Sequence, residues 1–233
     1  GKGMRNALII PLGEEELVIT SDNSGGIGQK EQDLVKVSYD VVGYHSFRVA
    51  VMECLAAGAK PITVVLQNFC GNEAWNSLIE GVQKGLKELD IDIPITGSTE
   101  TNFSLSQSAV GINIIGKKPV LESRPLGDWK NMQIALIGLP LVGEEVLTKR
   151  DQVAPLALFK KICEMGQVVV WPVGSKGVLH ELERMVPGRG KRINSVEIDI
   201  YKSGGPSTSF LVAYPEEQEQ TIKAISGNYF HKL

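Results

Sequence analysis

The sequence lacks the marks of several protein classes. No apolar run in its 233 residues approaches the roughly 20 that a membrane-spanning helix needs, and residues 1–6 contain no apolar signal-peptide core. Basic residues are not in excess, because 24 lysines and arginines stand against 27 acidic residues and give a formal net charge of -3. General binders of nucleic acid or of anionic membranes are usually basic. We therefore expect neither nucleic acid nor a membrane as a partner.

Cysteine is also scarce, and common site motifs are missing. Cys54, Cys70 and Cys163 are scattered without the spacing of a metal site, which is typical of reduced, buried thiols in a cytoplasmic protein. The three histidines have no zinc spacing. The short glycine loops of the chain match neither the P-loop nor the strand-linked G-x-G-x-x-G dinucleotide fingerprint.

The composition that remains is that of a globular protein, with 42% hydrophobic and 22% charged residues. The spacing of apolar residues predicts strands over 6–12, 17–21, 62–66, 93–96, 110–115, 134–139, 168–171, 196–200 and 210–213. It predicts helices over 37–55, 72–89, 155–165 and 177–185, and a last helix beginning at Pro215. Both halves mix strands with helices, so the fold class is α/β or α+β. Segment 117–130 is rich in proline, glycine and charge and is the predicted boundary region.

Two carboxylates follow predicted strands directly. Asp22 opens the glycine-rich segment 22–28, and Glu100 comes just after Gly97 and Ser98. We expect segment 22–28 to be a loop in which the backbone can approach a ligand closely. Each carboxylate has two interpretations: a turn or helix-capping role, or a magnesium ligand, since hard cations prefer oxygen donors and share them with phosphates.

A third carboxylate, Glu53, lies inside a predicted helix among apolar residues. An unpaired carboxylate beside so much apolar surface costs several kcal/mol. It must therefore be solvated at an edge, paired, or bound to a cation, and the sequence leaves these three alternatives open. Arg48 is five residues away, out of simple helical reach.

Other polar positions complete the set of candidates. They are Asn68 at the end of a predicted strand, and two glycine loops, one containing Gly174, Ser175 and Lys176 and the other Ser203, Gly204 and Gly205. Backbone N–H groups of such loops can bind phosphate, although short glycine loops are common in proteins of every function.

Three motifs resemble a known superfamily. The motifs are Thr20-Ser21-Asp22-Asn23-Ser24-Gly25-Gly26, the helix Val51-Met52-Glu53-Cys54-Leu55-Ala56-Ala57-Gly58-Ala59-Lys60-Pro61, and Thr96-Gly97-Ser98-Thr99-Glu100. In this order they resemble the superfamily of aminoimidazole-ribotide synthetase, thiamine-monophosphate kinase, selenophosphate synthetase and a hydrogenase maturation protein. The resemblance implies an α+β fold of two domains. The first (1–118) would bind ATP and magnesium and pair with a second copy into a dimeric barrel, and the second (119–233) would be a compact α/β substrate domain.

The resemblance also implies roles for individual residues. Asp22 would be the catalytic residue and, with Glu53 and Glu100, a magnesium ligand. The nucleotide would contact Asn23, Ser24, Gly25, Gly26, Asn68, Gly97, Ser98 and Thr99. The acceptor would contact Gly174, Ser175, Lys176, Ser203, Gly204 and Gly205. The chain departs from the family at Met52-Glu53, where members commonly have Asn-Asp, and at Ser98-Thr99, which shifts Glu100 by one position and leaves Thr99 as its substitute.

The chain is shorter than usual members, and the short subgroup that it most resembles is α-ribazole kinase, a cobalamin salvage enzyme. The matching segments are Lys202-Ser203-Gly204-Gly205-Pro206-Ser207-Thr208 and Gly138-Leu139-Pro140-Leu141-Val142-Gly143-Glu144-Glu145-Val146. This resemblance predicts ATP-dependent phosphorylation of the 5′-hydroxyl of α-ribazole, a small nucleoside. The alternatives are another reaction of the superfamily, such as a thiamine-monophosphate kinase or an ATP-driven ring closure, and a protein that binds ATP without turnover.

Overall fold

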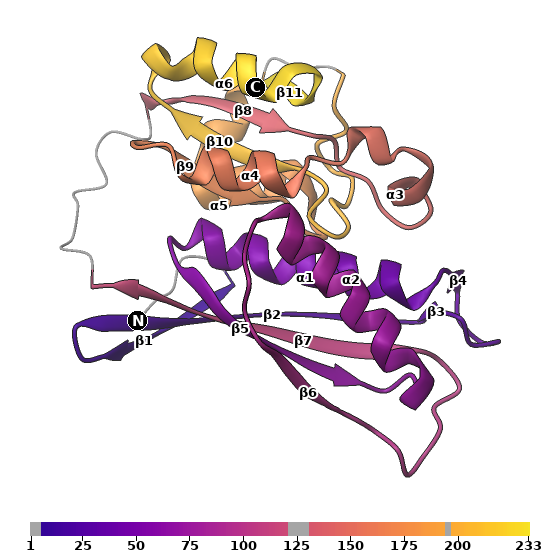
Figure 1. The fold of residues 1–233 in the computed structure, drawn as a ribbon. Helices are drawn as coiled ribbons and strands as arrows, with labels where there is room; N and C mark the ends of the chain where they lie inside the picture. Colours follow the sequence, from indigo (N-terminus) through magenta and orange to yellow (C-terminus); the bar gives the residue numbers. More distant parts are fainter. Residues whose placement is uncertain (1–5, 121–130, 194–196) are drawn as a thin grey trace. The chain divides into compact units, whose positions relative to one another are not determined.

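The chain divides into two compact units, Gly1–Leu121 and Glu122–Leu233. A computed structural model describes residues 6–120, 131–193 and 197–233 (Figure 1). The sequence analysis put the boundary after residue 118, which lies inside strand β7 (Ala109–Pro119). In the described ranges, no helix combines the length and the apolarity needed to cross a membrane. The three cysteines are free thiols.

A five-stranded sheet forms the N-terminal unit, in the order β1 (Ala7–Leu12), β2 (Glu15–Gly25), β7, β5 (Lys60–Asn68) and β6 (Ile95–Thr99). Neighbouring strands are antiparallel except β5 and β6, which are parallel. β7 lies at the centre, and its alternating apolar residues Val110, Ile112 and Ile114 are buried on one face. This alternation is the expected signature of a sheet with one covered face.

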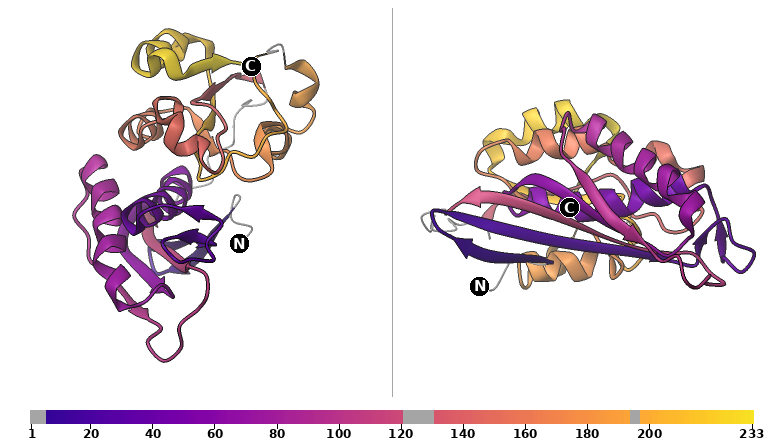
Figure 2. Two further views of the ribbon diagram at one scale, coloured as in Figure 1. Left: turned by 90° about the vertical axis from the view of Figure 1, so that its right-hand side faces the viewer. Right: turned by 60° about the horizontal axis from the view of Figure 1, so that its bottom comes forward.

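Helices α1 (Tyr39–Ala56) and α2 (Trp75–Glu88) cover that face (Figures 1 and 2). The hydroxyl of Thr20 in β2 donates to the carbonyl of Ala50 in α1 over 2.6 Å. The opposite face carries the exposed apolar side chains of Leu8, Ile10 and Leu12 on β1. Two short parallel strands, β3 (Ile27–Gly28) and β4 (Val35–Lys36), organise the segment between β2 and α1.

The C-terminal unit has a four-stranded antiparallel sheet in the order β11 (Phe230–Lys232), β8 (Gln133–Ile137), β10 (Phe210–Tyr214) and β9 (Val169–Pro172). One face packs on α5 (Gly177–Met185), whose Val178, Leu182 and Met185 join Leu136 and Leu211 in a buried cluster. The other face packs on α4 (Leu156–Cys163), where Phe159 meets the ring of Phe210 edge-on. Two further α-helices in the described part of this unit are α3 (Glu145–Thr148) and α6 (Glu219–Ser226).

The expected α+β class is confirmed, and three local predictions are wrong. β2 continues through residues 22–25, which we expected to be a loop, because β7 pairs with β2 as far as Gly25 and Ala109. β6 begins later and includes Gly97, Ser98 and Thr99, because these residues pair with the end of β5. In both places strand pairing outweighs the low strand propensity of small polar residues.

The third wrong prediction is the strand over 196–200. Val196 lies outside the described residues, and residues 197–200 form bends and a turn. The carbonyl of Ile200 accepts from the amide of Leu179 in the first turn of α5, and Ile198 packs into the buried cluster. These residues therefore contact the core individually and do not form the hydrogen-bond ladder of a strand.

Candidate functional site

Four of the residues expected at a nucleotide site share one end of the N-terminal sheet. The strand register pairs Ser24 with Val110, Val110 with Asn68, and Asn68 with Thr99. A row of side chains therefore crosses four strands, over about 15 Å at the usual strand spacing. Asp22 lies two residues before Ser24 and points to the same, helix-covered face.

Asp22 is the carboxylate of this group, and few protein donors stabilise its charge. Burial raises its pKa to about 7, and a hydrogen bond from the backbone N–H of Asn23 lowers it by less. No basic side chain of the described residues offsets the burial. A cation bound here would restore the charged form, and carboxylate oxygens are the donors that magnesium prefers. The chemistry of Asp22 therefore fits a magnesium ligand.

Asn68 and Thr99 are tied to each other. The buried Asn68 side chain donates to the hydroxyl of Thr99 over 3.1 Å and to the carbonyl of Gly71 over 2.8 Å. Its oxygen accepts from the amide of Cys70 over 2.8 Å. These bonds occupy both polar atoms of the amide and make Asn68 a turn organiser. Thr99 and the backbone of Gly97 and Ser98 lie on the edge strand β6.

Glu100 also has a turn role. Its Oε1 accepts from the backbone amides of Asn102 over 2.6 Å and Phe103 over 3.3 Å, and its own amide donates to the carbonyl of Asn68. The side chain therefore shapes the turn that follows β6. A magnesium role for Glu100 stays a prediction.

Glu53 is buried, with 5% of its surface exposed, and it takes part in an interaction within the chain. It lies three residues beyond Ala50 along α1, whereas Asp22 lies two residues beyond Thr20 along β2. α1 runs antiparallel to β2, because Tyr39 approaches Gly28 at one end and Ala57 accepts from Lys118 at the other. The two carboxylates therefore lie on opposite sides of the Thr20–Ala50 contact. Asp22 lies toward the Gly25 end of β2, and Glu53 lies toward its Glu15 end.

Among the described residues, Asp22, Glu53 and Glu100 do not come together in one metal-binding cluster. No group of three or more histidine, cysteine, aspartate or glutamate side chains that could hold a metal occurs in residues 6–120, 131–193 and 197–233. Of the three carboxylates, Asp22 is the one whose own surroundings, with burial and few donors, fit a metal ligand.

The sequence analysis missed the side chains that fix the glycine-rich segment. Asp33, Tyr39 and Ser108 form a buried hydrogen-bonded group beside Gly28. Asp33 and Ser108 are 75 residues apart in the chain. No local pattern links such positions, so the sequence offered no signal that would have found this group.

In the C-terminal unit, the two predicted glycine loops are neighbours. The amide of Gly204 donates to the carbonyl of Gly174 over 2.9 Å, and a side chain at Gly204 would meet the carbonyl of Val173 at 2.6 Å. The close approach explains the glycine. Ser175 and Lys176 are exposed, and Ser203 and Gly205 are partly exposed.

A third segment joins these loops through Thr208. The buried Thr208 hydroxyl donates to the carbonyl of Leu139 over 2.7 Å and accepts from the amide of Leu141 over 3.0 Å. Lys202 forms an ion pair with Glu145 in α3, with the ammonium 2.5 Å from Oε2. Thr208 and the ion pair of Lys202 with Glu145 thus tie three chain segments together around one set of glycine turns.

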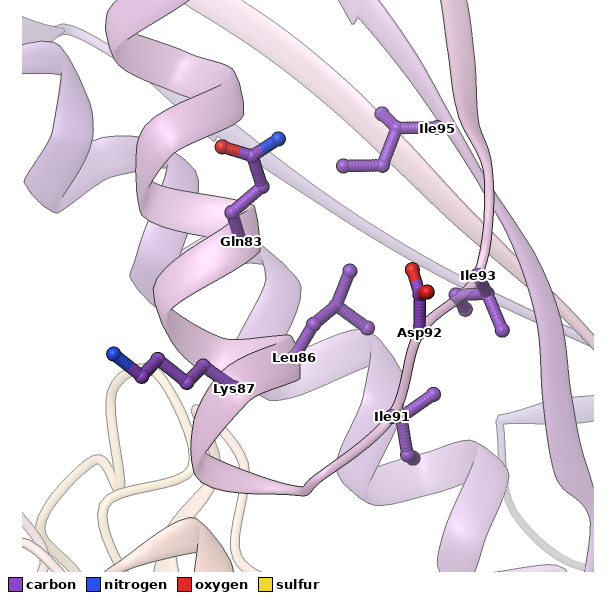
Figure 3. Close-up of a pocket in the computed structure, with 7 residues that line it drawn as sticks. All are labelled: Gln83, Leu86, Lys87, Ile91, Asp92, Ile93 and Ile95. Atoms are coloured by element: carbon purple, nitrogen blue, oxygen red, sulfur yellow. The ribbon is translucent and has the colours of Figure 1, made fainter.

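A groove lies elsewhere on the N-terminal unit, between α2 and the segment leading into β6 (Figure 3). Its volume is about 310 Å³, and it is lined by Gln83, Leu86, Lys87, Ile91, Asp92, Ile93 and Ile95. Figure 3 shows Gln83 directed toward Ile95 and Lys87 directed away from the groove. None of the predicted site residues lines it.

Solved structures with the same fold exist. A protein of Thermus thermophilus designated tt0281 has a TM-score of 0.63, with 12% identity over 97% of this chain and 84% of its own. Hydrogenase maturation protein HypE in complex with ATP has a TM-score of 0.60, with 13% identity over 93% and 75%. Thiamine-monophosphate kinase from Stenotrophomonas maltophilia K279a has a TM-score of 0.56, with 13% identity over 97% and 87%.

These matches cover almost the whole chain and establish its fold. The chain has the aminoimidazole-ribotide-synthetase-like fold that its motifs predicted. No protein-family model matches the sequence, and no curated protein matches it.

Proposed function

We propose that this chain is an ATP-dependent phosphotransferase that uses magnesium and phosphorylates the 5′-hydroxyl of α-ribazole. The observation that carries the proposal is the sheet end that Asp22 and Ser24 on β2, beside the glycine turn at Gly25 and Gly26, share with Thr99 on β6. Two proteins that share this fold are described as bound to ATP (HypE) and as a thiamine-monophosphate kinase. That shared fold supports an ATP-using activity for this chain.

In this proposal the N-terminal unit holds the nucleotide. Asp22 presents its carboxylate oxygens to magnesium, with phosphate and water oxygens completing the shell. Magnesium, when bound, neutralises charge on the transferred phosphoryl group. Asn23, Ser24, Gly25 and Gly26 supply backbone and hydroxyl donors to the phosphates. Gly97, Ser98 and Thr99 form the neighbouring edge of the site, whose shape Asn68 maintains through its bond to Thr99. This scheme does not require the predicted metal roles of Glu53 and Glu100, because Glu53 lies on the other side of the Thr20–Ala50 contact and Glu100 shapes the turn after β6.

The C-terminal unit binds the acceptor in this proposal. Exposed Ser175 and Lys176 lie in a glycine turn that is hydrogen-bonded to the second turn at Ser203, Gly204 and Gly205. Together these groups offer hydroxyl, ammonium and amide donors to a ribose. Phosphoryl transfer depends on such positioning more than on covalent chemistry by the protein.

We also propose that the active form is a homodimer. The helix-free face of the N-terminal sheet carries exposed Leu8, Ile10 and Leu12, and exposed apolar groups of this kind mark interaction surfaces. A second copy of the same sheet would cover them. Light scattering of the wild type and of Ile10→Glu tests this: we expect a dimer that the substitution disrupts, and a monomeric wild type would contradict it.

Purified protein with magnesium-ATP and either α-ribazole or thiamine monophosphate tests the activity, with products identified by mass. We expect ribazole phosphate and ADP in equal amounts. Turnover with thiamine monophosphate alone would favour the second candidate, which the structural likeness to a thiamine-monophosphate kinase supports. ATP binding without turnover of either acceptor would indicate a binding protein. Failure to bind ATP would overturn the proposal.

A further inference from the structure

A buried carboxylate organises the segment that follows the proposed phosphate site. Asp33 is 6% exposed and accepts three hydrogen bonds. Its Oδ1 accepts from the amide of Ser108 over 2.7 Å, and its Oδ2 accepts from the Ser108 hydroxyl over 2.6 Å and from the amide of Lys30 over 2.9 Å. Burial alone would raise the pKa of Asp33, but these bonds together with the charge of Lys36 lower it below its usual value.

The hydrogen bonds among Tyr39, Ser108 and Asp33 have a defined donor-to-acceptor direction. An ionised carboxylate accepts only, so the single proton of the Ser108 hydroxyl points to Asp33. The Ser108 oxygen, 2.8 Å from the Tyr39 hydroxyl, must then accept from Tyr39. The bonds therefore run from Tyr39, the first residue of α1, through Ser108, just before β7, to Asp33 in the loop between β3 and β4. Three segments are fixed at one carboxylate.

Gly28 allows this group to lie directly against the backbone. A side chain at Gly28 would meet the Tyr39 ring at 2.7 Å and Oδ2 of Asp33 at 2.9 Å, and it would also overlap the Ser108 hydroxyl. Backbone hydrogen bonds also attach the glycine-rich segment to its neighbours. The Gly26 amide donates to the carbonyl of Ser108 over 2.8 Å, and the Val37 amide donates to the carbonyl of Gly28 over 3.1 Å.

The attachment controls where Gly25 and Gly26 lie. Gly25 is the last residue of β2, and Gly26 is held at its amide by Ser108, whose own amide and hydroxyl are held by Asp33. Glycine turns have no side chains to fix them, so an external group has to supply the rigidity. A displacement of about 1 Å at a phosphate-binding turn is enough to weaken binding or transfer severely.

We propose that Asp33 is a positioning residue for the nucleotide site: through Ser108 it holds the Gly25–Gly26 turn in the geometry that receives the ATP phosphates. The inference rests on the proposed function and goes beyond it, because Asp33 itself touches no nucleotide. It predicts that loss of Asp33 acts on nucleotide affinity at temperatures where the variant is fully folded.

The test compares Asp33→Asn with Tyr39→Phe, which removes the outermost bond, and with Glu183→Gln as a matched control. Glu183 accepts from the amides of Gly188 and Gly190, both over 2.8 Å, and so holds a glycine turn in the C-terminal unit by the same chemistry. Calorimetry gives Kd for magnesium-ATP well below each unfolding midpoint, steady-state assays give KM and kcat, and hydrogen exchange reports the Gly26 amide.

We expect Asp33→Asn to raise Kd and KM for ATP about tenfold, with kcat changed less and with faster exchange at Gly26. Tyr39→Phe should change them by about twofold to threefold, and Glu183→Gln should leave Kd unchanged although it lowers the unfolding midpoint. Unchanged Kd in folded Asp33→Asn would overturn the positioning role while the proposed function stands. A wild type that does not bind ATP would overturn both.

Discussion

Asp22 opens the glycine-rich segment 22–28 of the N-terminal unit and Asp33 follows that segment, yet the fold shifts their pKa values in opposite directions. Burial raises the pKa of Asp22 to about 7, and one backbone hydrogen bond opposes this. At Asp33, burial is outweighed by bonds from Ser108 and Lys30 and by the charge of Lys36, so its pKa is lowered. Both side chains are largely shielded from water, so burial alone does not separate them.

The difference lies in what each carboxylate receives from the chain. Asp33 has its acceptor positions filled by protein donors, and its charge is therefore already stabilised. At Asp22 the charged form keeps the free-energy cost of burial, and a bound cation would remove that cost. Of these two carboxylates, Asp33 therefore supplies structure and Asp22 remains available for a ligand.

The largest expected effect is the loss of turnover in Asp22→Asn. The amide keeps the shape of the side chain but removes the charge that would bind magnesium, so kcat/KM should fall by about 100-fold to 1000-fold. Steady-state kinetics over a range of magnesium concentrations would measure it. Asp40, an exposed aspartate in the first turn of α1, provides the control Asp40→Asn, which should retain activity. Equal activity of both variants would show that Asp22 binds no essential metal.

Asp33→Ala should cause the largest loss of stability. It leaves the amides of Ser108 and Lys30 without their acceptors, at a cost of about 2–3 kcal/mol in the free energy of unfolding. Because the pKa of Asp33 is lowered, its contribution is present above the unfolded-state value near 4 and is lost as the pH falls through the folded-state value. Urea denaturation should thus give a constant difference from wild type between pH 5 and 8 that shrinks below about pH 4.

This contrast was only partly visible in the sequence. Periodicity predicted α1, α2 and α5 and most strands, because these elements bury one regular face. It placed the end of β2 wrongly, since pairing with β7 is a long-range property. Asp22 stood out because it follows a strand and precedes glycines. Asp33 did not, because its partner Ser108 comes from a distant segment. Whether a carboxylate receives hydrogen bonds depends on donors that are distant in the sequence. The sequence alone therefore could not show that Asp33 is hydrogen-bonded and that Asp22 has few donors.

The substitution Asp22→Asn should also stabilise the protein at neutral pH. A raised folded-state pKa means that the folded chain retains a proton that the unfolded chain releases, so the contribution of Asp22 to stability falls as the pH rises from about 4 to about 7. Asp22→Asn removes this loss. We expect its free energy of unfolding to exceed that of wild type by about 1–3 kcal/mol at pH 8 and to match it near pH 4.

Magnesium-ATP adds a second arm to that experiment. If Asp22 binds the metal, the ligand should raise the unfolding midpoint of wild type and close the gap to Asp22→Asn at pH 8. A gap that is independent of pH would mean that Asp22 is already satisfied, as Asp33 is, and the contrast between them would disappear.

Thr208 extends the comparison to a neutral group in the C-terminal unit. Its hydroxyl joins Leu139 and Leu141 as Asp33 joins its own partners. Thr208→Val keeps the shape and removes the bonds, and should cost about 1–2 kcal/mol, whereas Thr208→Ser should retain most of the stability. This loss should not depend on pH between 5 and 8, because no ionisable group is removed. Urea midpoints at three pH values would check it, and a pH-dependent loss would contradict the neutral role.

The smallest effect is expected at Glu145, although the pKa of its side chain is lowered as well. A hydrogen bond from Lys202 is the main cause of its lowered pKa, but both side chains are about 30% exposed. Water and salt replace much of what such a pair provides. Lys202→Met should therefore shift the unfolding midpoint only slightly, and 0.5 M salt should remove the difference. A loss comparable to that of Asp33→Ala would mean that the charge partner, rather than burial with protein donors, decides which carboxylates stabilise this fold.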